Sequence, residues 1–185
     1  MEADWEAEIG AGAPVIDGSW PGFVDLRRAP KRIVEIEEAH RFAPLAEALL
    51  RLNGARSPLW TVKCDLWTPE HLDPEEMEAG PQESAQGLAC YIDVLPASSL
   101  VFARFEQAES WARGAVNRIR NRPCRCCRAD LVIRAAVTVE REGFGITIYV
   151  QACGADAVAA TGHLTAALIE VIEAIIAPAP QDISA

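Results

Sequence analysis

The sequence predicts an α+β domain in which helices pack on one face of a four-stranded, mainly antiparallel sheet, in the order α-β-β-α-β-β-α, after an extended N-terminal arm. Four segments alternate apolar and polar residues, which is typical of strands with one buried face. Three other segments repeat apolar residues at helical spacing. The chain has 185 residues, 50% of them hydrophobic, which is enough for one sizeable core.

Residues 1–32 form the expected arm. Glycines and prolines recur between Gly10 and Pro30, a density that excludes a long regular element. Trp5, Trp20 and Phe23 are nevertheless too apolar for a solvated tail. We therefore expect the arm to lie across a surface, either of the same chain or of a partner.

The α+β domain is expected to span residues 33–178. Its first half holds one helix and two strands. Residues 33–41 fit a short strand and a helical turn equally well. A helix follows, with Leu45 and Leu49 at helical spacing, Pro44 at its first position and Asn53 at its stop. Residues 59–67 and 88–96 alternate as strands. In the first of them, the apolar face is expected to carry Trp60, Val62, Cys64 and Leu66.

The second half repeats the pattern of helix, strand and strand, and ends in another helix. Residues 102–121 carry an apolar helical stripe, and residues 127–139 and 143–154 alternate as strands. Both strands keep their apolar residues on one face only if an even number of residues connects them. A long helix is expected over 156–176, and a disordered tail over 179–185.

Composition and charge exclude several classes of partner. Lys and Arg total 17 against 27 Asp and Glu, a net charge of −10, so we expect neither nucleic acid nor an anionic membrane as a partner. The first residues show no secretory signal, and Glu170 and Glu173 interrupt the longest apolar run. We expect a cytoplasmic protein of bacterial origin, with its six cysteines reduced.

The stretch NRPCRCCRADLVIR, residues 121–134, gathers cysteines and arginines. Cys64, Cys90 and Cys127 fall on apolar strand faces and are interpreted as small buried hydrophobes. Cys126 is expected to face outward between Arg125 and Arg128, where positive charge would favour its thiolate and make it the most reactive thiol. With the histidines scattered, we predict no metal site and no cofactor.

The polar faces of the four strands are expected to form one surface with aromatic side chains beside charges of both signs. Such a surface suits recognition, although cross-strand Asp–Arg pairs on an ordinary solvated face would look the same. The candidate binding residues are Asp65, Trp67, Tyr91, Arg128, Arg134 and Tyr149. The weaker catalytic candidates are Asp93, Asp130 and Cys126.

Three functions follow from these features. The leading hypothesis is a non-enzymatic module that binds another protein, or itself as a homodimer, through the arm and the polar sheet face. In the alternative, Arg128 and Arg134 clamp a small anionic compound and Asp93 or Asp130 acts as a base. A thiol-based redox sensor built on Cys126 comes third. The sequence contains no Walker, Rossmann, zincin or kinase motif.

Overall fold

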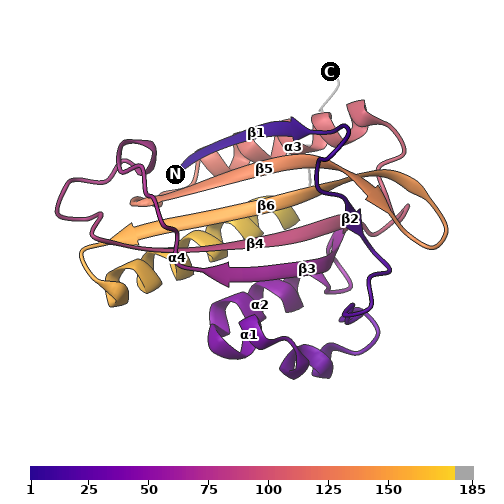
Figure 1. The fold of residues 1–185 in the computed structure, drawn as a ribbon, viewed down its shortest axis with the longest axis horizontal. Helices are drawn as coiled ribbons and strands as arrows, with labels where there is room; N and C mark the ends of the chain where they lie inside the picture. Colours follow the sequence, from indigo (N-terminus) through magenta and orange to yellow (C-terminus); the bar gives the residue numbers. More distant parts are fainter. Residues whose placement is uncertain (178–185) are drawn as a thin grey trace, which may run out of the picture.

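A computed structural model describes residues 1–177, and the tail predicted over 179–185 lies outside them. The α+β class is confirmed (Figure 1). The strands are β1 (Glu2–Glu8), β2 (Ile16–Asp17), β3 (Leu59–Trp67), β4 (Gln86–Pro96), β5 (Cys127–Val137) and β6 (Glu142–Gly154). The α-helices are α1 (Glu37–Arg41), α2 (Ala43–Leu52), α3 (Phe105–Arg120) and α4 (Ala157–Ile176), and short 3-10 helices span Pro30–Glu35 (η1) and Glu75–Met77 (η2).

The sheet has six strands, so the prediction of four is wrong. Its order is β1-β5-β6-β4-β3, with β2 also paired to β5. β1 and β2 both come from the predicted arm and run parallel to β5, whereas the other neighbours are antiparallel. The glycines and prolines begin only after β1, which alternates Ala3, Trp5 and Ala7 with acidic residues. This alternation is the strand signal that the arm interpretation overlooked.

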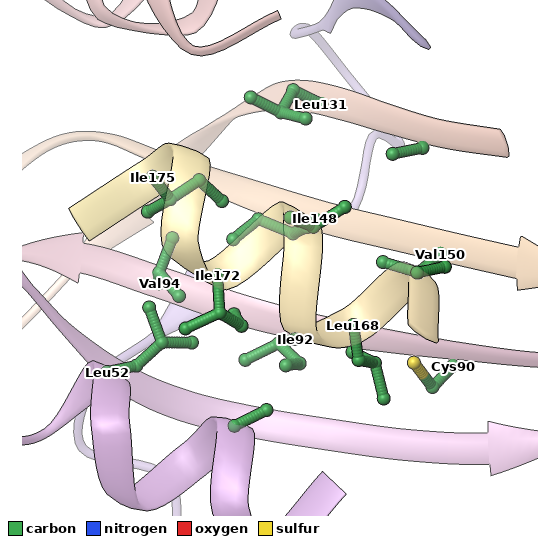
Figure 2. Close-up of a cluster of buried hydrophobic side chains, with 14 of the residues drawn as sticks. Leu52, Cys90, Ile92, Val94, Leu131, Ile148, Val150, Leu168, Ile172 and Ile175 are labelled. Atoms are coloured by element: carbon green, nitrogen blue, oxygen red, sulfur yellow. The ribbon is translucent and has the colours of Figure 1, made fainter. Parts of the chain in front are cut away.

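The main core lies between the sheet and the helices on one of its faces (Figure 1). Figure 2 shows side chains of α4, including Leu168 and Ile172, directed at Ile92 and Ile148 of the sheet. β5 and β6 are joined by Thr138–Arg141, and their register pairs Leu131 with Ile148. The connection therefore has the even length that was predicted, and both apolar faces meet the helices.

Helix α4 belongs to this core. By length and composition alone it could cross a membrane, a criterion that core helices of soluble proteins also meet. Here Leu164, Leu168 and Ile172 are buried. The helix begins at Asp156, whose side chain accepts a hydrogen bond of 2.8 Å from the amide of Ala159, so that a free amide of the first turn is satisfied.

A β-bulge in β3 changes the expected facing of that strand. The register shifts between Thr61 and Lys63, so Trp60 pairs with Leu95 while Cys64 pairs with Ile92. An extra residue turns the preceding side chains to the opposite face. Trp60 and Val62 therefore lie on the face away from the main core, contrary to the prediction from strict alternation.

The arm docks on the same chain, where it covers a second apolar cluster. Its members are Ile16, Trp60, Val62, Leu95, Val101 and Ala136, with Trp20 and Phe23 packed against them. Phe23 meets Trp60 edge-on at 5.5 Å between ring centroids, and Trp20 Nε1 donates a hydrogen bond of 3.1 Å to the carbonyl of Val62. The apolar side chains of the arm are thus largely used within this chain.

Candidate functional site on the open sheet face

The candidate site is the open face, defined as the face of the sheet turned away from the main core. Strand register places Asp65, Tyr91, Tyr149 and Asp130 in one row across β3, β4, β6 and β5. The row continues to Asp4 on β1. All the polar residues predicted to share a face do so, because period-2 alternation holds in each strand beyond the bulge.

An aromatic trio occupies the centre of the open face. Tyr91 and Tyr149 lie 5.8 Å apart between ring centroids, and Trp67 lies 6.1 Å from Tyr91 and 6.4 Å from Tyr149. The guanidinium of Arg134 stands 5.6 Å from the ring centroid of Tyr149. The trio thus presents faces and edges of rings that attract cations and apolar groups.

Arg134 is held by neighbours on the two strands that flank β5. It donates hydrogen bonds of 2.6 Å to Glu8, 3.2 Å to Thr147 and 3.1 Å to the hydroxyl of Tyr149. Burial would lower the pKa of Arg134, but the bonds to Glu8 and Tyr149 outweigh it and raise that pKa. The charge of this predicted anion clamp is already matched by the carboxylate of Glu8.

Arg128 is paired in the same way. Its Nε lies 2.8 Å from the carboxylate of Asp130, and its Nη1 lies 3.2 Å from that of Glu76. The bond to Asp130 raises the pKa of Arg128 in spite of partial burial. Glu8 belongs to the segment predicted as an arm, and Glu76 lies between the strands predicted over 59–67 and 88–96, which is why sequence reasoning missed both as partners.

Asp93 is the one buried carboxylate of the face, with 8% of its surface exposed. Thr147, which is fully buried, donates it a hydrogen bond of 2.5 Å. Burial raises the pKa of Asp93, and Thr147, Arg134 and Lys63 reduce that rise without cancelling it. This carboxyl therefore holds a proton more readily than a solvated aspartate does.

Two neighbouring hollows divide the open face. One, of about 410 Å³, is lined by Asp4, Arg128 and Asp130, and the other, of about 310 Å³, by Lys63 and Asp93. Arg134 and Tyr149 line both. Asp93 and Asp130 lie two strands apart, on β4 and β5 with β6 between them, so these catalytic candidates do not converge on one point.

The expected exposure of Cys126 is wrong. Only 2% of its surface is exposed, and its backbone is left-handed, at a φ of 57°, because β5 begins one residue later. It packs with Met77 and Cys153, and burial raises its pKa. Among residues 1–177, no group of three or more His, Cys, Asp or Glu side chains is placed to hold a metal ion.

A thiol pair lies nearby instead. The Sγ atoms of Cys124 and Cys127 are 2.9 Å apart, and the two residues have the C-x-x-C spacing. That spacing is visible in the sequence, and the interpretation of the cysteines overlooked it.

The chain matches no protein-family model, no curated protein and no solved structure.

Proposed function

We propose that this chain is a binding protein, without catalytic activity, whose open face recognises a basic segment of a partner protein. The observation that supports this best is the excess of carboxylates around the aromatic trio. The acidic residues are Asp4, Glu6, Glu8, Asp65, Glu76, Asp93 and Asp130, and the basic ones are Lys63, Arg128 and Arg134, together with Arg120 of α3, which pairs with Asp4. Each of the three arginines already binds a carboxylate, so the remaining charge is negative.

A lysine or arginine of the partner would find aromatic rings and carboxylates here, the two kinds of group that bind a cation. The rings of Trp67, Tyr91 and Tyr149 favour a cation near their faces, and Asp65 and Asp130 lie in the same row, on either side of the two tyrosines. Complementary charge of this kind speeds association and selects the partner.

The same charge argues against two of the earlier alternatives. A homodimer through this face would bring two acidic surfaces together, which is unfavourable. A small anion would have to displace Glu8 from Arg134 or Asp130 from Arg128, since both guanidinium groups are occupied. Ile16 of the arm is buried, so the arm offers no free apolar segment to a partner. Its contribution to the open face is the acidic residues of β1.

Isothermal titration calorimetry with an oligo-arginine peptide tests the proposal. The double variant Asp65→Asn with Glu6→Gln removes two exposed acids of the open face. Its matched control, Glu47→Gln with Glu106→Gln, removes two exposed acids of α2 and α3 and leaves the same net charge. At about 0.2–1 kcal/mol for each exposed ion pair, the first variant should weaken binding about 2- to 30-fold more than the control.

Two results would overturn this assignment. Equal weakening in both double variants would mean that the peptide responds only to net charge. Tighter binding of an oligo-glutamate peptide or of inorganic phosphate would instead favour the anionic ligand, with Arg128 and Arg134 as its clamps.

A further inference from the structure

The Cys124–Cys127 pair is the part of the molecule whose chemistry the binding proposal does not use. The two sulfur atoms are 2.9 Å apart, within about 1 Å of the length of a disulfide bond. Cys124 lies in the turn after α3, and Cys127 is the first residue of β5, where it pairs with Ala152 of β6. A regular strand therefore fixes one thiol, and a turn holds the other against it.

The two thiols differ in ways that suit two chemical roles. Cys124 is 8% exposed and Cys127 only 1%, so a small reagent reaches Cys124 more easily. The hydrogen bond from Cys127 lowers the pKa of Cys124 to about 7 although burial opposes it, whereas the pKa of Cys127 is raised. Cys124 is thus the thiol of the pair that ionises more readily, and Cys127 is the one that donates the hydrogen bond.

Titratable groups at the N-terminus and on α4 face this thiolate. The amino group of Met1, ahead of β1, and His163 on α4 favour the negative charge, and Glu170 on α4 opposes it. The amino group is held 3.0 Å from the carbonyl of Arg122, in the same turn as Cys124. The N-terminal amino group is therefore fixed close to the Cys124 sulfur, where it stabilises the thiolate.

We propose that Cys124 and Cys127 are a redox-active dithiol, which a peroxide oxidises to an intrachain disulfide. The Cys124 thiolate attacks one oxygen of hydrogen peroxide, the O–O bond breaks, and hydroxide leaves as a sulfenic acid forms. The Cys127 sulfur then attacks that sulfenic sulfur, the S–O bond breaks, and water leaves. In total two thiols and one peroxide give one disulfide and two waters, and an external dithiol restores the reduced pair.

The other cysteines lack this arrangement. Cys153 Sγ donates a hydrogen bond of 3.7 Å to the carbonyl oxygen of Cys126, and both side chains are buried. Burial raises the pKa of both of these thiols. Cys90 is fully buried, and burial raises the pKa of Cys64 to about 12.

Peptide mapping of the wild-type protein tests the proposal without any variant. Arg125 stands between the two cysteines, and Pro123 protects the bond after Arg122 from trypsin. After treatment with one equivalent of hydrogen peroxide and alkylation in denaturant, a non-reducing digest should link peptide 121–125 to peptide 126–128. Four of the six cysteines should still be alkylated, and dithiothreitol should release the link.

Two variants assign the link to its sulfur atoms. Cys126→Ser should keep it, and Cys127→Ser should abolish it and leave a sulfenic acid at Cys124. The midpoint of Cys124 alkylation against pH should also rise in Cys127→Ala, since alanine cannot donate a hydrogen bond to the thiolate. A first disulfide involving Cys126 or Cys153, or no loss of thiols before the protein unfolds, would overturn the proposal. Peptide binding at the open face is a separate readout, so the two proposals can fail independently.

Discussion

Replacing Thr147 with valine tests whether the buried polar network of the open face is as tightly coupled as its geometry indicates. The hydroxyl of Thr147 donates to Asp93 at 2.5 Å and accepts from Arg134 at 3.2 Å. Valine has nearly the same shape, so it removes both hydrogen bonds with little change in packing. Asp93, which is 8% exposed, would then lose its only side-chain donor among residues 1–177.

The size of the effect follows from the charge of the acceptor. A hydrogen bond to a charged group contributes about 1.5–3 kcal/mol to stability. We therefore expect Thr147→Val to lower the free energy of unfolding by about 1.5–3 kcal/mol at pH 7. Thr147→Ser is the matched control, because it keeps the hydroxyl and loses one buried methyl group, which costs about 0.8 kcal/mol.

Urea denaturation followed by circular dichroism measures both variants. The bond from Thr147 lowers the pKa of Asp93, so its loss raises that pKa further. The deficit of the valine variant should consequently be larger at pH 7 than at pH 4, where the carboxyl is closer to neutral in either protein. A valine variant as stable as the serine variant at pH 7 would refute the coupling, as would an undiminished loss in an Asp93→Asn background.

Three other predictions concern the same face and the helix behind it. Burial raises the pKa of Asp93 in the folded state, so the contribution of its protonated form to stability is present at low pH and is lost as pH rises through that pKa. Urea titrations from about pH 4 upwards should therefore show wild type losing stability relative to Asp93→Asn. Parallel pH curves for the two proteins would contradict this. Gly145→Ala should destabilise the chain, since its Cβ would lie 2.6 Å from Leu95 and 2.9 Å from Ile16. Gly162→Ala in α4, with no atom within 4 Å, should stabilise it by about 0.5–1 kcal/mol; thermal melts that rank the two alanine variants the other way would disprove this.

Most of the correct predictions rest on the alternation of apolar and polar residues. It located β3 to β6 and placed Asp65, Tyr91, Tyr149 and Asp130 on one face, because each strand has one apolar face and a two-residue period. It failed at Trp60, since a bulge adds a residue without leaving a signature in the composition.

Contacts between distant segments were out of reach. Glu8 pairs with Arg134 because β1 runs parallel to β5, and Glu76 pairs with Arg128 because of where η2 lies. No local sequence signal shows which segments these two elements pack against. The error about Cys126 was of another kind: its outward side was inferred by extending the alternation of β5 back by one residue. Cys126 instead precedes the strand, has a left-handed backbone and is buried.

The pairing of β1 with β5 has a consequence for the order in which the chain matures. Glu8 and Arg134 are separated by 126 residues, so a chain leaving the ribosome has made β1 long before its partner exists. Until β5 is made, β1 has no place in the sheet, and closing so long a loop is slow compared with forming the hairpin of β5 and β6. The acidic residues of β1 are therefore expected to be among the last to join the open face. Until β1 pairs with it, β5 has an unpaired edge that is open to other strands.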